Sequence, residues 1–234
     1  MKYDEIEDFI TTKIKTGEYV ADEKIPSENQ LAEIFSVSRM TVHKAIDNLV
    51  ARNYLFRLPK KGIYVLNLSE KYTIYLDELN GFTTRAERLG KKSSSKVIKF
   101  ELKEPSTLIK TKMKLEKNEK IFYIERARLL NEEPIIFEIN YIRQNKVENL
   151  SMLDAQKSIE QYLKQNDIQV KRVEKEFVAS MPDKKIKEAL GLSNNTTLLR
   201  IDYTNFDQDN EVFKFTKVFY NQNKCRFLQI IDII

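Results

Sequence analysis

The chain is poor in the residue types that support disulfide bonds, zinc sites and much of catalysis. Its 234 residues include one cysteine, one histidine and no tryptophan. Because Cys225 has no second cysteine to pair with, a disulfide framework is excluded, and a reducing cytoplasm is the natural setting. With His43 as the single histidine, a His-rich metal site is excluded as well. We therefore expect no metal and no cofactor.

Long hydrophobic runs are also missing. No stretch approaches the roughly 18 to 20 unbroken apolar residues of a membrane span, and the acidic start of the chain, MKYDEIEDF, is unlike a signal peptide. The hydrophobic fraction of 41% is nevertheless enough for packed cores, and the length suits one large or two small domains. These features predict a cytoplasmic protein that does not enter a membrane.

The net charge of +5 is distributed unevenly. Residues 1–33 carry four Lys or Arg against nine Asp or Glu, whereas residues 34–66 carry six against one. A small region that is acidic at first and basic afterwards is typical of a domain that presents one basic surface to a nucleic acid duplex.

Three helices are predicted before residue 53. Apolar residues recur at helical spacing over residues 3–15. Ser27 and Gln30 form a capping-box pattern that opens a second helix. We expect the inner face of this helix to consist of Leu31, Ala32, Ile34 and Phe35. Ser38 is the expected N-cap of a third helix, which should stop at Asn53, a residue that tolerates a left-handed conformation.

A basic β-hairpin follows the third helix. Residues 54–57 and 63–65 have strand patterns, and Pro59–Gly62 forms the turn between them. Three helices, the last two joined by a tight turn, followed by such a hairpin describe a winged helix-turn-helix. We expect this domain to span residues 1–66 and the polar connection after it, residues 67–74, to be a linker.

Residues 75–234 predict a second domain in which strands and helices alternate. Helices are expected at 84–89, 105–111, 157–165 and 182–190, and strands at 97–102, 121–130, 135–142, 170–180, 198–206, 212–220 and 227–233. Turns around Asn131–Pro134 and Asp207–Asn210 imply hairpins, hence an antiparallel sheet, which we expect to carry helices on one side. The chain is therefore predicted to have an α+β fold.

The segment that begins at Ile25 reads IPSENQLAEIFSVSRMTVHKAIDNLV and is followed by YL and by KGIYV. The joint pattern PSE, LA..F.VSR.TV..A...L and G-x-x-V at these spacings resembles the GntR family of bacterial transcription regulators. The resemblance covers residues 3–66. It implies a winged helix-turn-helix that binds double-stranded DNA.

The physical requirements for reading a major groove agree with this resemblance. A recognition helix needs short polar and cationic side chains near its N-terminus. Arg39 is our first choice for base readout, because its fork can contact O6 and N7 of guanine together. Serine and threonine hydroxyls suit phosphate contacts, and the wing tip can approach the minor groove. The predicted DNA-binding residues are Ser27, Ser38, Arg39, Met40, Thr41, His43, Lys44, Lys60, Lys61 and Gly62.

Two of these positions depart from the family pattern. His43 stands where members usually have arginine, and Lys60 stands where they usually have a second glycine in the wing. The departures leave room for an operator that differs from the common family half-site. Ser27 and Ser38 also have a simpler interpretation as helix caps. Arg39 and the wing lysines could likewise be solvated surface residues.

Residues 75–234 resemble the UTRA effector domain of the HutC subfamily, whose fold is related to chorismate lyase. The matching pieces are Gly81-Phe82-Thr83, Glu125-Arg126-Ala127-Arg128, Pro134–Glu138, Ser158 at the start of a helix, Leu190-Gly191-Leu192 and a strand that ends at Tyr220. The resemblance implies a domain that binds a small effector.

Two arginines mark the expected effector site. Arg126 and Arg128 continue an apolar strand face, where they are costly to bury without an anion or a carboxylate. The resemblance implies that Glu138 points to the same side, and that the arginines hold a phosphate or carboxylate with nearby hydroxyls and helix N-termini, under a cover formed by Phe82. The predicted effector-binding residues are Phe82, Thr83, Arg126, Arg128, Glu138, Ser158, Lys214 and Tyr220.

Two points about this site stay open. The arginines and Glu138 could form an internal salt bridge that binds no ligand. Lys214, where the family often has glutamate, could point outward to water. If Lys214 faces the site, the ligand should carry one more negative group than a simple sugar phosphate.

We therefore predict a homodimeric transcription regulator, more plausibly a repressor than an activator, that binds a pseudo-palindromic operator. A small anionic effector, such as a phosphorylated sugar, would change its operator affinity. One alternative is a lyase-like enzyme tethered to a DNA-binding head, but no nucleophile–base signature supports catalysis, and we expect no enzyme. Another alternative is a non-specific architectural DNA binder with an empty second domain.

Overall fold

The computed structural model describes residues 2–58, 60–66, 71–76, 81–147, 149–193, 196–229 and 231. The chain forms two compact units. The first unit contains residues 1–80, 87–90 and 226–234, and the second contains residues 81–86 and 91–225. Within the described ranges, no helix has both the length and the apolar character needed to cross a bilayer.

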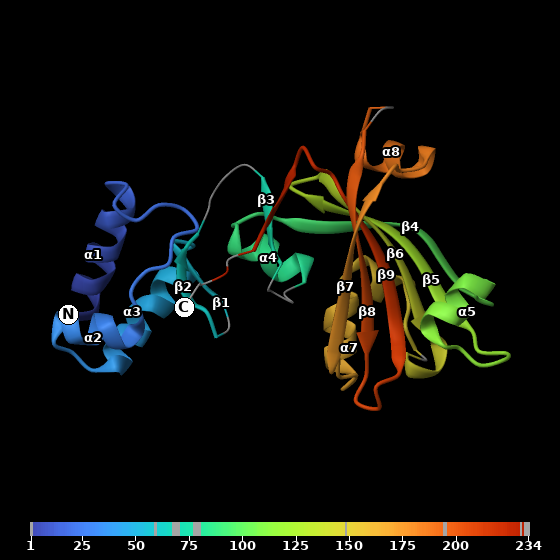
Figure 1. The fold of residues 1–234 in the computed structure, drawn as a ribbon, viewed down its shortest axis with the longest axis horizontal. Helices are drawn as coiled ribbons and strands as arrows, with labels where there is room; N and C mark the ends of the chain where they lie inside the picture. The colour runs from blue at the N-terminus through green and yellow to red at the C-terminus, as the bar shows by residue number, and fades with distance from the viewer. Residues whose placement is uncertain are drawn as a thin grey trace. The chain divides into compact units, whose positions relative to one another are not determined.

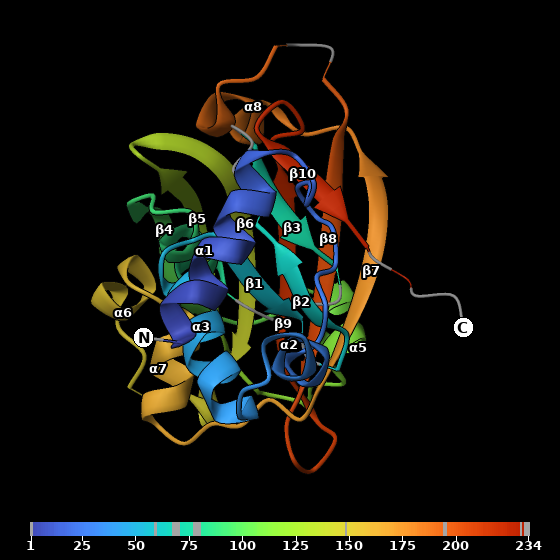
Figure 2. The same cartoon turned by 90° about the vertical axis from the view of Figure 1, so that its left-hand side faces the viewer.

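The first unit contains the predicted three helices and hairpin. The elements are α1 (Lys2–Lys15), α2 (Glu28–Phe35), α3 (Arg39–Ala51), β1 (Leu55–Leu58) and β2 (Gly62–Val65), which face the viewer in Figure 2. The predicted capping box is confirmed, because Ser27 Oγ accepts from the Gln30 N–H while Gln30 Oε1 accepts from the Ser27 N–H. Ser38 caps α3, and Asn53 after that helix has a φ of 60°.

The core of this unit lies between the apolar faces of α1, α2 and α3. Fully buried residues include Ile6, Ile10, Leu31, Val42, Ile46 and Leu49. One residue expected in this core is not there, because Ile34 is 59% exposed. Leu31, Ala32 and Phe35 pack toward the core, and Ile34 lies about 100° around the helix from Phe35, which places it outside that face.

A small sheet that we did not expect completes the first unit. Strand β3 (Tyr72–Tyr75) pairs with β10 (Cys225–Leu228), the last strand of the chain. The Phe56 ring of β1 packs against Tyr75 of β3, with the centroids 4.4 Å apart. β3 lies across the border that we expected between the linker and the second domain, at residues 74 and 75. Its residues are buried in a strand, whereas we expected a polar connection there.

The second unit is built on a six-stranded antiparallel sheet with the strand order β4-β5-β6-β9-β8-β7 (Figure 1). The strands are β4 (Ser93–Lys103), β5 (Ile121–Leu130), β6 (Glu133–Arg143), β7 (Arg172–Ser180), β8 (Leu198–Phe206) and β9 (Val212–Tyr220). The helices are α4 (Phe82–Arg88), α5 (Thr107–Met113), α6 (Met152–Gln156), α7 (Ile159–Gln165) and α8 (Lys184–Leu190), and η1 (Gln144–Lys146) is a short 3-10 helix. Both expected hairpins, β5–β6 and β8–β9, are confirmed.

Helices cover both faces of this sheet, so the expectation of helices on one side was wrong. α6 and α7 pack on the face that carries Phe122 and Ile124. α5 and α8 pack on the opposite face, against Phe215 and Phe137 respectively. β5 and β9 are buried on both faces, so each face of the sheet is covered.

The register between β5 and β6 decides where the polar side chains of these strands point. The turn leaves two residues between Leu130 and Glu133, a length that alone would place Arg126 and Glu138 on opposite faces. A bulge at Ile135 adds one residue, so that Arg126 lies directly opposite Glu138. The predicted common side of the arginines and Glu138 is therefore confirmed. We call this surface of the sheet the Arg126 face.

Candidate functional site

The start of α3 presents polar and cationic side chains to solvent. The Arg39 side chain is 71% exposed and Met40 is 72% exposed. Ser38 Oγ lies 2.9 Å from Thr41 Oγ1 and also accepts from the Thr41 N–H. Ser38 thus caps the helix, as does Ser27 on α2. The capping interpretation of both serines is correct. Both residues are also exposed to solvent.

Glu28 connects two arginines and a histidine on this surface. Its carboxylate lies 3.3 Å from Arg39 Nε and 3.0 Å from Arg57 Nη2. His43 Nδ1 lies 2.8 Å from Glu28 Oε1, and His43 Nε2 lies 3.3 Å from Asp47 Oδ2. Partial burial alone would raise the pKa of Glu28, but hydrogen bonds from these three side chains outweigh burial and lower it.

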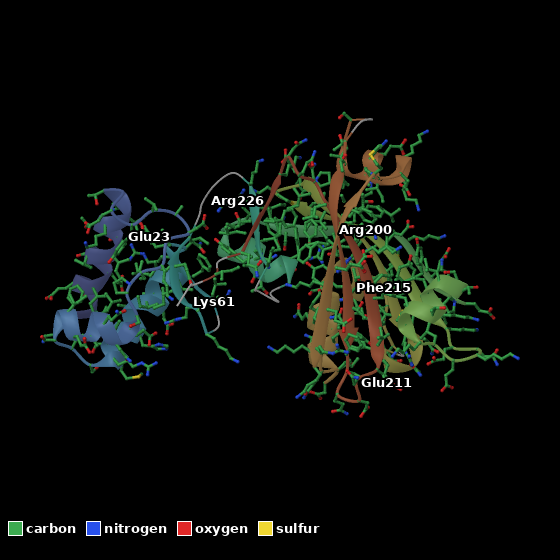
Figure 3. All side chains as sticks on the ribbon, in the orientation of Figure 1. Glu23, Lys61, Arg200, Glu211, Phe215 and Arg226 are labelled. Atoms are coloured by element: carbon green, nitrogen blue, oxygen red, sulfur yellow. The ribbon has the colours of Figure 1, made fainter. Side chains whose placement is uncertain are left out.

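The hairpin turn carries the remaining predicted DNA-binding residues. Lys60 is exposed, and Lys61, labelled in Figure 3, is half-buried. Lys60 has a φ of 64° and Gly62 a φ of 121°. A Cβ added at Gly62 would lie 3.0 Å from Lys24 Cε, so the glycine allows both the turn and the close contact with Lys24. Lys44 on α3 lies over the ring of Tyr3, 4.8 Å from its centroid.

The second unit buries two arginines on the Arg126 face. Arg126 has no exposed surface and Arg128 retains 2%. Arg126 Nε donates to Glu138 Oε2 at 2.6 Å, and Arg126 Nη1 donates to the carbonyl of Ala155 in α6. Arg128 Nη1 lies 3.9 Å from the other Glu138 oxygen. A single carboxylate therefore lies against two buried guanidinium groups.

α4 supplies the predicted cover of Arg128. The Thr83 hydroxyl accepts from Arg128 Nη2 at 3.1 Å, and the Phe82 ring lies 4.5 Å from Arg128 Cζ. Phe82 is 7% exposed. The structure thus brings together five of the eight predicted effector residues, namely Phe82, Thr83, Arg126, Arg128 and Glu138.

Lys214 belongs to the same cluster and does not point to water. It lies opposite Ile142, on the Arg126 face, and its side chain is 6% exposed. Its Nζ lies 3.0 Å from Glu160 Oε1, and Glu160 Oε2 lies 4.0 Å from Arg126 Nη2. The positive charges of Lys214, Arg126 and Arg128 lower the pKa of the Glu160 carboxylate.

Neutral polar groups lie beside these charges. Asn140 Oδ1 accepts from the Thr216 hydroxyl at 3.0 Å, and the hydroxyls of Tyr203 and Tyr220 are 2.9 Å apart. Burial raises the pKa of Tyr203. Three buried polar atoms on the Arg126 face have no hydrogen-bond partner within the described part of the chain, namely Ser95 Oγ, Arg126 Nη2 and Asn140 Nδ2. Such atoms are costly to bury unless a further molecule contacts them.

Ser158, another of the predicted effector residues, lies at the start of α7. Its hydroxyl caps α7 by accepting from the Gln161 N–H, and it lies 3.4 Å from Glu160 Oε2. Its link to the cluster therefore passes through Glu160.

Sequence reasoning missed two acidic residues, one in each of the two candidate sites. Glu28 belongs to the PSE motif and Glu160 follows the Ser158 cap by two residues, so both positions were visible as acids in the first turn of a helix. The cations that contact them come from other elements, Arg57 from β1 and Lys214 from β9. Such pairs depend on how the elements pack, and no local pattern indicates them.

A winged helix-turn-helix with a cationic recognition helix, together with a second unit that buries arginines beside hydroxyl and amide groups, defines a ligand-responsive DNA-binding regulator. Two family models match the chain. "Bacterial regulatory proteins, gntR family" matches residues 2–65, and "UTRA domain" matches residues 88–226. The chain therefore belongs to the GntR-family transcriptional regulators that carry a UTRA effector-binding domain.

Similar bacterial proteins agree with this assignment. The chain is 29% identical to the HTH-type transcriptional regulator TreR of Bacillus subtilis over 220 residues, which cover 94% of this chain and 92% of TreR. It is 29% identical to the HTH-type transcriptional repressor NagR of B. subtilis over 231 residues, or 98% and 94% of the two chains. A probable fructoselysine utilization operon transcriptional repressor of Escherichia coli is 29% identical over 217 residues, or 90% and 86%.

Solved structures show the same fold. The possible transcriptional regulator YydK of B. subtilis superposes with a TM-score of 0.65 at 22% identity, covering 99% of this chain and all of that chain. The effector binding domain of the B. subtilis trehalose repressor, TreR, gives a TM-score of 0.54 at 23% identity, covering 60% of this chain and 99% of that chain. The relatives found by sequence, all transcriptional regulators or repressors by name, support the regulator interpretation over the enzyme alternative.

Proposed function

We propose that this regulator represses genes of sugar utilisation and that a phosphorylated sugar, bound on the Arg126 face, controls its affinity for the operator. The observation that carries the proposal is the burial of Arg126 and Arg128 side by side on one face of the sheet, where both lie against the carboxylate of Glu138. A buried charge that lacks a partner is strongly unfavourable, so a cluster of this kind is suited to an anion. The names of the similar proteins, which concern trehalose and fructoselysine, point to the same class of metabolite.

The charges of the cluster indicate how much negative charge the effector carries. Arg126, Arg128 and Lys214 contribute three positive charges, and Glu138 and Glu160 contribute two negative charges. Arg85, 8% exposed on α4, adds a further positive charge whose field acts on Tyr203. Among the described residues of this face, cations thus outnumber carboxylates, which suits a phosphate monoester, whose charge is about −1.5 to −2 at neutral pH. Asn140, Thr216 and the two tyrosines are suited to sugar hydroxyls.

The first unit supplies the proposed DNA contacts. Arg39 and Met40 on the exposed start of α3 would contact base edges, with His43 beside them. The hydroxyls of Ser27, Ser38 and Thr41, together with the Lys44 ammonium, would contact phosphates. Lys60, Lys61 and Gly62 would bring the wing to the minor groove.

Repression by such a protein requires two heads on one operator. We propose a homodimer on a pseudo-palindromic site in the cytoplasm, because two identical heads related by a twofold axis recognise two half-sites. Effector binding would favour one of two states of the dimer that differ in operator affinity.

The test starts from DNA that lies upstream of the gene and of its neighbours. Fluorescence anisotropy identifies the fragment that the full chain binds in competition with random DNA at a fixed salt concentration. Sugar phosphates that raise the melting temperature are then added to this complex. We expect the active compound to release the operator from the wild type, and to leave Arg128→Gln bound at more than tenfold higher concentrations.

The control for this test is Lys184→Gln, because the Lys184 side chain is 90% exposed on α8. This variant should respond like the wild type. An effector that releases Arg128→Gln as readily as the wild type would exclude the Arg126 face as the effector site. Operator affinity that no stabilising compound changes would contradict effector control altogether.

A further inference from the structure

Glu160 lies between the cations of the Arg126 face. Its two oxygens point to different partners, Oε1 to Lys214 Nζ at 3.0 Å and Oε2 to Arg126 Nη2 at 4.0 Å. Lys214 is 5% exposed, whereas the Glu160 side chain retains 47% of its surface. Lys214 is thus fixed in the sheet, and the carboxylate reaches it from the first turn of α7.

Glu160 takes the place that a second anionic group of a ligand would otherwise occupy. A lysine buried in a sheet needs a negative partner, and Glu160 is the carboxylate in contact with it. At the other end of the cluster, Arg126 and Arg128 lie against Glu138, and Glu160 Oε2 lies 4.0 Å from Arg126 Nη2. Lys214 thus has a carboxylate at hydrogen-bond distance, and the proposed anion position lies with the arginines.

We propose that Glu160 is a specificity-determining residue that neutralises Lys214 and restricts the effector to a single anionic group. The inference rests on the proposed function and adds a restriction to it. The sequence alone suggested that an inward Lys214 would demand a second negative group on the ligand. The Lys214–Glu160 pair removes that demand, and it offers the ligand an ammonium donor and a carboxylate acceptor for neutral hydroxyls instead.

The position of Glu160 is held by its own helix. The Ser158 hydroxyl, which caps α7, lies 3.4 Å from Glu160 Oε2. Ile159 and Leu163 of the same helix are buried against the sheet and fix α7 there. The packing of α7 therefore holds Glu160 beside Lys214.

Inorganic phosphate is a suitable probe, because it tests the anion positions without requiring the natural sugar. The stabilisation of the full chain is measured by thermal unfolding over a series of phosphate concentrations at constant ionic strength, with chloride as the balancing ion. Above the dissociation constant, the slope of stabilisation against the logarithm of concentration reports the number of phosphates bound. Phosphate that binds to the DNA-binding residues contributes equally to all variants, so differences between variants report the Arg126 face.

We expect Glu160→Gln to raise this slope by one phosphate per chain, because it leaves Lys214 without its negative partner. The double variant Glu160→Gln with Lys214→Gln should return the slope to the wild-type value. Glu188→Gln, a change on α8 at a side chain that is 68% exposed, is the matched control and should have the wild-type slope. Lys214→Gln alone leaves Glu160 facing the arginines, and we expect it to weaken phosphate binding about tenfold or more.

The outcomes separate the inference from the function on which it rests. If Glu160→Gln folds and its slope equals that of the wild type, the restriction by Glu160 is overturned while the anion site stands. If Glu160→Gln does not fold, unchanged phosphate binding by Lys214→Gln overturns the restriction equally. If Arg128→Gln has the wild-type slope, the arginines do not bind the anion, and the proposed function fails first.

Discussion

Glu28 accepts hydrogen bonds from side chains of two elements, Arg39 and His43 on α3 and Arg57 on β1. Its carboxylate is 13% exposed, so the surrounding protein shields these interactions from water. Asp47 repeats the arrangement one helical turn beyond His43 by pairing with both His43 and Arg57. Two acids thus hold Arg39, His43 and Arg57 in place on the surface that we propose contacts DNA.

Glu28 should make the stability of the first unit depend on pH. Its pKa is lowered in the folded chain, so its stabilisation is complete above the ordinary glutamate pKa of about 4.3 and is lost as the pH falls through the lowered value. We expect Glu28→Gln to destabilise the protein by about 1–2 kcal/mol at pH 7 and by progressively less as the pH falls below about 4.3. Thermal unfolding of both proteins over this pH range measures the difference, and a difference that stays constant with pH would contradict the role of the charge.

Secondary-structure elements show how far local patterns determine the fold. The caps at Ser27 and Ser38 involve atoms within three residues of each other, and both were predicted correctly. Strands β5, β8 and β9 also have the predicted bounds, because their alternating or continuous apolar residues span the whole strand. α6 was not predicted, since its five residues are too few for a helical period to be visible. Strand β3 was missed because it needs β10, which lies about 150 residues further along the chain.

The β1–β2 hairpin depends on one glycine. Gly62 has a φ of 121°, a conformation that strains any residue with a Cβ, and its added Cβ would contact Lys24 at 3.0 Å. We expect Gly62→Ala to destabilise the protein by about 1–3 kcal/mol and to weaken operator binding, because the wing tip would shift. Thermal unfolding and anisotropy measure the two effects. Gly17→Ala is the control, since Gly17 has a φ of 78° but no atom lies within 4 Å of an added Cβ. If both variants bind the operator equally weakly, the wing has no role of its own in binding.

At the scale of the whole molecule, the chain passes from the first unit into the second and returns to the first at its C-terminal end. β10, which carries the Arg226 labelled in Figure 3, pairs with β3. Asp22 accepts from the Tyr75 hydroxyl of β3 and pairs with Arg226 of β10. Only a few residues separate Tyr220, at the end of β9, from this C-terminal strand. The covalent path from the effector sheet to the DNA-binding unit is therefore short at this end of the chain.

Removal of β10 should destabilise the DNA-binding unit. A chain that ends at Cys225 lacks the Arg226–Asp22 pair and the packing of Leu228 against the cluster around Phe56. We expect the melting transition of the first unit to fall by several degrees, since about 1 kcal/mol corresponds to roughly 4–8 °C in a unit of this size. Differential scanning calorimetry measures the shift, with a deletion of residues 232–234 as the control. Equal melting curves for the two deletions would show that β10 does not support the first unit.

The sequence by itself determined the class of the protein and most of its elements. These features are local, because caps, helical periods, strand alternation and the GntR motif each involve residues close together in the chain. The tertiary structure decided the charge pairs: the bulge at Ile135 places Arg126 opposite Glu138, and the packing of α7 brings Glu160 to Lys214. Such pairs join residues 12 and 54 positions apart, so they follow from register and helix packing and not from any local pattern.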